Sequence, residues 1–118
     1  MGLFRRKPPA VPVDGDGDGD GAVLVHFPLS DDEFGTDAER GTVGDLGDRL
    51  ADVVARAGVG EFDGDEFGNG EAVLYLYGPD DKRLWQVVEP EVRACSLRAS
   101  FALLRPGGPD VPARRVDL

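Results

Sequence analysis

Residues 59–80, VGEFDGDEFGNGEAVLYLYGPD, predict two β-strands joined by a tight turn, and this hairpin decides the fold. The Asn69-Gly70 pair tolerates the positive φ values that a two-residue hairpin turn requires. Side chains alternate between the two faces of a strand, so Tyr75 and Tyr77 share one face of the second strand, and Leu74 and Leu76 share the other. We therefore expect a sheet with one leucine face and one tyrosine face.

The chain before the hairpin predicts one strand and one amphipathic helix. Residues 22–29, AVLVHFPL, are rich in β-branched residues and form the predicted first strand. Thr36 and Glu39 have the spacing of a capping box, which starts a helix, and Gly58 suits its left-handed end. The apolar positions of this helix recur at intervals of three and four, which predicts one buried stripe that includes Leu50 and Val54.

The chain after the hairpin predicts a second helix and a fourth strand. Asp80 caps the helix, and Val88, Val92 and Cys95 lie on its buried face. Pro90 falls inside the pattern, so we expect a kink or a break there. Residues 98–105, RASFALLR, form the predicted fourth strand, and residues 113–118 either add a short edge strand or remain loose.

The resulting order of elements, β, α, β, β, α, β, predicts an α+β domain of the ferredoxin-like type. In that fold two split βαβ units interleave into a four-stranded antiparallel sheet with both helices on one face. The other face is then open to solvent, a ligand or a second copy of the chain.

Two regions of the 118-residue chain are expected. Residues 1–21 contain prolines and an alternating Asp-Gly run with nothing to bury, which predicts a disordered N-terminal tail and linker. Residues 22–118 form a single domain. The Asp-Gly run also fails as an EF-hand loop, because its twelfth position holds no glutamate.

The distribution of charge constrains the partners. The net charge of −10 is concentrated in residues 14–71, which hold 17 acids against three arginines, while residues 72–118 are close to neutral. Nucleic-acid binding depends on basic surfaces that neutralise phosphates, so DNA is excluded as an expected partner and RNA is disfavoured. No membrane-spanning stretch or signal-peptide pattern occurs, and the single cysteine cannot form an internal disulfide. We expect a cytoplasmic protein.

The acidic hairpin, Glu61 to Glu71, is a candidate metal site. If alternate strand positions share a face, Glu61, Asp63 and Asp65 converge, with Glu66 beside them, and carboxylates suit Mg²⁺ or Ca²⁺. The competing interpretation is a solvated, repulsive hairpin that protects a sheet edge from aggregation.

The second candidate site is the open sheet face, with His26, Tyr75 and Tyr77 as binding residues. His26 faces the open side if the valines around it face the helices. A lone histidine and a buried cysteine make neither a zinc site nor a nucleophile pair, so no catalytic residue is expected. Glycine-rich phosphate loops, a nucleophile elbow and a Cys-x-x-Cys motif are missing from the sequence, so no cofactor is expected.

The segments GEFDG-x-E (from Gly60), LY-x-YGPD (Leu74 to Asp80) and VEP (Val88 to Pro90) resemble a group of small uncharacterised bacterial proteins. The resemblance implies the domain boundaries but no activity. The sequence therefore favours a non-catalytic interaction or regulatory module that binds a protein partner or a second copy of itself through its open sheet face. The alternative is a small enzyme or a metal-dependent ligand-binding domain that uses the acidic hairpin.

Overall fold

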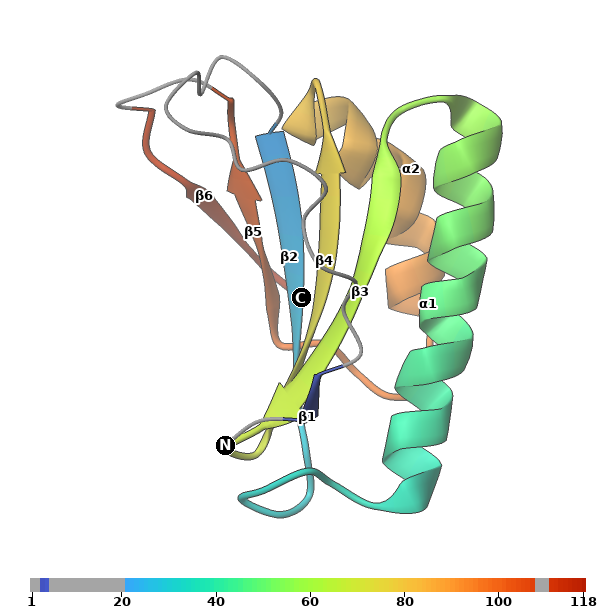
Figure 1. The fold of residues 1–118 in the computed structure, drawn as a ribbon. Helices are drawn as coiled ribbons and strands as arrows, with labels where there is room; N and C mark the ends of the chain where they lie inside the picture. Colours follow the sequence, from blue (N-terminus) through green and yellow to red (C-terminus); the bar gives the residue numbers. More distant parts are fainter. Residues whose placement is uncertain (1–2, 5–20, 108–110) are drawn as a thin grey trace.

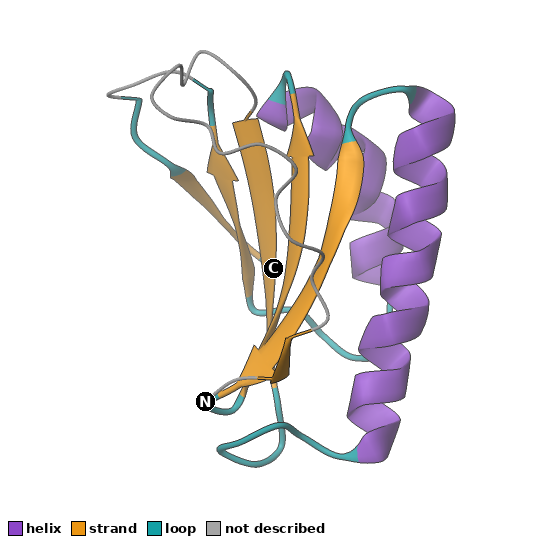
Figure 2. Ribbon diagram, in the orientation of Figure 1, coloured by secondary structure: helices purple, strands orange, loops and turns teal. Residues whose placement is uncertain are grey.

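The computed structural model describes residues 3–4, 21–107 and 111–118, which form two helices and six strands. Figure 1 labels the elements, and Figure 2 separates helices from strands by colour. In chain order they are β1 (Leu3–Phe4), β2 (Gly21–Pro28), α1 (Asp37–Ala57), β3 (Glu61–Gly68), β4 (Glu71–Gly78), α2 (Asp81–Ala94), β5 (Phe101–Arg105) and β6 (Arg114–Asp117).

The predicted ends of α1 are confirmed. The N–H of Glu39 donates to Thr36 Oγ1 at 3.1 Å, and the N–H of Thr36 donates to Glu39 Oε1 at 2.9 Å, which completes the capping box. At the other end Gly58 adopts the left-handed conformation, with a φ of 67°. Local chemistry therefore defines both ends of the longer helix.

The predicted hairpin and second cap are also confirmed. Asn69 and Gly70 both have positive φ, 54° and 75°, and join β3 to β4. The Asp80 side chain accepts hydrogen bonds from the second and third N–H groups of α2. Of the kink or break expected at Pro90, the break is wrong, because α2 continues through Pro90 to Ala94. Buried side chains on both sides of the proline, Val88 and Val92, hold the helix against the sheet.

All strands belong to one antiparallel sheet with the order β1-β3-β4-β2-β5-β6. The expectation of four strands is wrong, because β1 pairs with the free edge of β3 and β6 pairs with the free edge of β5. The predicted disorder of residues 1–21 falls mostly outside the described residues. Within that segment, Leu3 and Phe4 pair with β3, and Gly21 begins β2.

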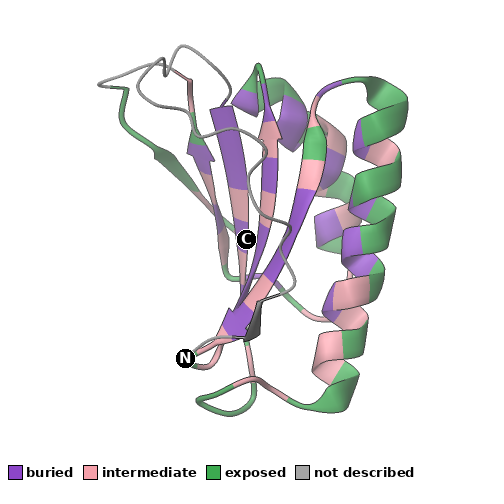
Figure 3. Ribbon diagram, viewed as in Figure 1, coloured by how far each residue is buried: buried purple, intermediate pink, exposed green. Residues whose placement is uncertain are grey.

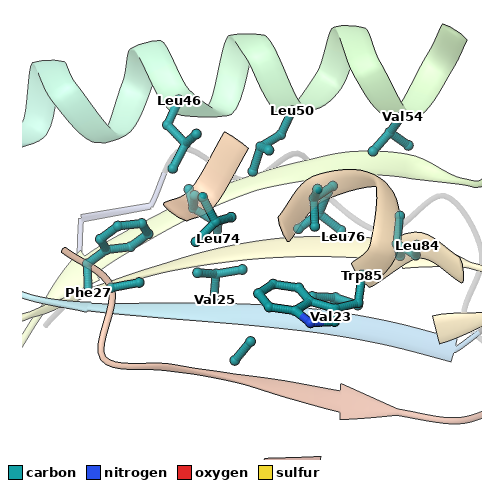
Figure 4. Close-up of a cluster of buried hydrophobic side chains, with 14 of the residues drawn as sticks. Val23, Val25, Phe27, Leu46, Leu50, Val54, Leu74, Leu76, Leu84 and Trp85 are labelled. Atoms are coloured by element: carbon teal, nitrogen blue, oxygen red, sulfur yellow. The ribbon is translucent and has the colours of Figure 1, made fainter. Parts of the chain in front are cut away.

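Both helices lie on one face of the sheet (Figure 1), where α1 contacts β3 and α2 contacts the central strands and β5. Between the layers lies one hydrophobic core, in which side chains from α1 meet those of β2 and β4 (Figure 4). The four predicted core residues are confirmed as buried: Leu50, Val54, Val88 and Val92. Among the described residues, neither helix combines the length and the apolar character that crossing a bilayer demands.

Alternation along β2 determines which side chains reach the other face. Val23, Val25 and Phe27 are fully buried against the helices, whereas Leu24 and His26 between them are half-buried on the opposite face. Figure 3 shows this alternation as purple and pink bands along the strand. The prediction that His26 lies on the face away from the helices is confirmed.

Two glycines of α1 have different roles. A Cβ added to Gly47 would lie 2.9 Å from Cζ of Phe62 on β3, so Gly47 lets the helix approach the strand closely. A Cβ added to the exposed Gly41 would meet nothing within 4 Å. Gly41 therefore carries the conformational cost of glycine without a packing benefit.

We predict that Gly41→Ala stabilises the protein by up to ~1 kcal/mol, because alanine has the higher helix propensity. For a domain of this size that corresponds to a rise in Tm of roughly 4–8 °C. Gly47→Ala, the matched control, gains the same propensity but must displace the Phe62 ring, so its Tm should not rise. Thermal unfolding followed by circular dichroism measures both, and an equal rise in the two variants would contradict the packing role of Gly47.

The carboxylate of Glu39 connects the loop before α1 to the helix. It accepts hydrogen bonds from the N–H of Thr36 and from both the N–H and the hydroxyl of Ser30. The hydrogen bond from the Thr36 backbone is the largest cause that holds the pKa of Glu39 below its ordinary value of 4.5. The folded protein therefore favours the ionised form of Glu39.

We predict that Glu39→Gln unfolds at a lower urea concentration than the parent at pH 7, because the charged acceptor is lost. A lowered folded-state pKa contributes stability above the unfolded-state pKa, and this contribution disappears as the pH falls through the folded-state pKa. The difference between parent and variant should therefore shrink as the pH falls below 4.5. Glu33→Gln, in the same loop, is the control; a difference that does not change with pH would contradict this role.

Candidate functional site

The face of the sheet away from the helices, here called the open face, carries side chains in three rows that cross the strands. Cross-strand neighbours share a face, so the registers of β3, β4, β2, β5 and β6 place these residues side by side. The first row holds Glu61, Tyr77, Ala22 and Arg105; the second holds Gly64, Tyr75, Leu24, Leu103 and Arg115; the third holds Glu66, Val73, His26, Phe101 and Asp117.

His26 lies at the centre of the third row and makes specific contacts with Glu71 and Phe101. Its Nδ1 donates to Glu71 Oε2 at 2.5 Å, and its ring stacks on Phe101 with centroids 4.3 Å apart and planes 15° apart. The guanidinium of Arg115 lies 4.0 Å from the Phe101 centroid on β5. The ring of Phe101 therefore contacts an imidazole and a guanidinium, which ties β2, β5 and β6 together.

Tyr75 joins the open face to the acidic hairpin. Its hydroxyl donates to Glu66 Oε1 on β3 at 2.6 Å. Beside this bond a small hollow of about 160 Å³ is lined by Glu66, Gly68, Asn69, Glu71 and Val73. Glu66 is hydrogen-bonded to Tyr75, and Glu71 is hydrogen-bonded to His26. The aromatic side chains therefore hold these two carboxylates in place.

The structure brings together the three binding residues expected from the sequence. Tyr75 and Tyr77 are half-buried on β4, and the registers place them on the same face as His26. The sequence indicated a histidine without a partner. In the structure Glu71 accepts a hydrogen bond from His26. Their assignment to a binding surface stays a prediction.

The expected convergence of the acidic hairpin is wrong. A register shift between Phe62 and Gly64 adds one residue to β3, so that Glu61 pairs with Tyr77 and Asp65 pairs with Leu74. Glu61 therefore lies on the open face with Glu66, whereas Asp65 is buried on the helix side. Asp63, at the shift, is also buried. Across residues 3–4, 21–107 and 111–118, no three acid, histidine or cysteine side chains are grouped so that they could hold a metal ion.

Cys95 is not the fully buried core residue that the helical pattern indicated. It is half-exposed at the end of α2 and lines a pocket of about 440 Å³ together with Arg93, Arg98 and Leu118. The pattern overestimated its burial because the helix ends at Ala94, so that Cys95 leaves the buried face.

The sequence analysis missed several residues of the open face, among them Phe101, Leu103, Arg105 and Arg115. Alternation in RASFALLR was a sufficient signal for the first three, because Ala102 and Leu104 between them face the core. Nothing in the sequence placed Arg115 there, since its position depends on the pairing of β6 with β5.

Comparison with known proteins finds no matching protein family, no matching curated protein and no matching solved structure. The resemblance to small uncharacterised bacterial proteins stays a prediction.

We predict that Arg115 and Phe101 are energetically coupled. Cation–π contacts at exposed sites contribute ~0.5–1 kcal/mol, and Arg115→Gln should lose this amount in the parent but not in a Phe101→Leu background. The free energies of unfolding of the parent, the two single variants and the double variant form a double-mutant cycle. Urea unfolding followed by the fluorescence of Trp85, which is 6% exposed, measures all four. Arg114→Gln, one residue earlier in β6, is the control, and a coupling energy near zero would show that the contact does not stabilise the face.

Proposed function

We propose that this protein is a non-catalytic interaction module that pairs with a second copy of itself through the open face. The observation that carries the proposal is the second row, in which Tyr75, Leu24 and Leu103 lie side by side and half-buried on three adjacent strands. Apolar and aromatic side chains grouped on one sheet face are typical of contact surfaces.

The proposed fold type is ferredoxin-like. The inner strand order β3-β4-β2-β5, with both helices on one face, supports this assignment. Such a sheet has a helix layer on one side only, and two-fold pairing is the common way to cover the other side. A cytoplasmic location belongs to the same proposal and rests on the single cysteine.

The chemistry of the open face supports a protein partner over a nucleic acid. Glu61, Glu66 and Glu71 lie beside the aromatic side chains and repel phosphate. His26 is hydrogen-bonded to Glu71 through Nδ1 and stacked on Phe101, so its imidazole helps to hold these side chains in place on the open face. A regulatory module that acts by binding another protein requires a contact surface, and the open face is the surface proposed for it.

We predict that the parent is a dimer and that Tyr75→Glu with Tyr77→Glu makes it a monomer, because charges are placed where side chains must lose water. Light scattering at matched concentration measures the mass. The control variant, Ala51→Glu with Gln86→Glu, adds the same charge to exposed positions on the helices and should leave the dimer intact.

A monomeric parent would contradict the proposal. If deletion of residues 1–20 then produced a dimer, the open face would be assigned to the chain's own N-terminal segment. A dimer that survives the tyrosine substitutions would place the contact elsewhere on the surface.

A further inference from the structure

The charges of the open face are separated from one side of the sheet to the other. Acids lie on β3 and β4, where Glu61, Glu66 and Glu71 share the face. Arginines lie on the opposite side, with Arg105 on β5 and Arg115 on β6, the latter paired with Asp117 at 2.7 Å. When two copies of such a face meet, opposite charges lie together in one orientation and like charges lie together in another.

If the strands of the two sheets are aligned, two symmetric orientations place one open face on another. If the two-fold axis is perpendicular to the strands, β3 of each copy lies over β3 of the other, and like charges meet. If the axis is parallel to the strands, β3 of each copy lies over β5 of the other, and acids meet arginines. Like charges in contact suppress pairing, so electrostatics selects the second orientation.

We propose that two copies pair about a two-fold axis parallel to the strands, so that Glu61 of each copy faces Arg105 of the other. This inference rests on the proposed function and adds its geometry. The first row carries it, because Glu61 and Arg105 end the same row, Glu61–Tyr77–Ala22–Arg105. A rotation about this axis keeps each row level and exchanges its two ends.

The two charged ends of the first row are available for this contact. Both side chains are exposed, and neither forms an ion pair with any residue that the structure describes. Within one copy they are separated by β4 and β2, three strand spacings or about 14 Å, which is too far for a direct bond. Among the residues that the structure describes, Glu61 and Arg105 therefore have no oppositely charged partner, and the dimer supplies one for each.

The second row fits the same orientation. It places Tyr75 of each copy over Leu24 of the other, so the apolar centres coincide at the axis. It also places Leu103 over Gly64, which has no side chain and leaves room for the leucine. Facing sheets lie about 10 Å apart, a distance that side chains of this size fill.

The test exchanges the charges of the first row. Glu61→Arg alone and Arg105→Glu alone should each raise the dimer dissociation constant about tenfold or more, because each creates two like-charge contacts. An equimolar mixture of the two variants should pair as tightly as the parent, and so should the chain that carries both substitutions. Fluorescence anisotropy of dilute labelled protein measures the constants.

Controls separate the contact from a general effect of charge. Arg114→Glu, whose register pairs it with Leu104 on the helix side of the sheet, and Asp48→Arg, exposed on α1, should leave the constant unchanged. Circular dichroism confirms that each variant is folded, and recovery in the mixture shows independently that both chains are competent to pair.

The outcomes distinguish this inference from the proposed function. If the parent is a dimer that the tyrosine substitutions disrupt, but the mixture does not recover, the axis is wrong and the proposed function stands. If the parent is a monomer, both fail. Equal weakening by Arg114→Glu and Arg105→Glu would also overturn the inference, because the effect would then not depend on the face.

Discussion

The structure depends on the central position of β2, which is hydrogen-bonded to β4 on one side and to β5 on the other. Its inward residues, Val23, Val25 and Phe27, are fully buried against the helices. A slip of one residue would expose all three, so burial sets the registers of both neighbouring strands. The composition of the open face follows from these registers.

A register shift in β3 redistributes the acidic charge of the hairpin. Without it, alternation would place Glu61, Asp63 and Asp65 on one face, as a carboxylate cluster. With it, Asp65 lies on the helix side, and Glu66 shares the open face with Glu61 and accepts a hydrogen bond from Tyr75. One additional residue in β3 thus separates carboxylates that would otherwise lie together, and it leaves acids along one side of the open face.

The polar groups of the open face are organised by its aromatic rings. Phe101 is stacked on His26 and lies under Arg115, while His26 is bonded to Glu71, so side chains from β2, β4, β5 and β6 hold one another. Side chains already ordered in the monomer lose less conformational entropy when a partner binds. This order supports the proposal that the open face binds a partner.

The sequence by itself determined what depends on neighbours along the chain: the capping box at Thr36, the hairpin turn at Asn69, and the faces of β2 and β4. These are predictable because hydrogen bonds within a few residues and alternation in a strand need no distant partner. Only the tertiary structure decided the pairing of β6, the register shift in β3, the course of α2 through Pro90 and the position of Arg115 beside Phe101. Each of these depends on packing between segments distant in sequence, which is where local preference is overruled.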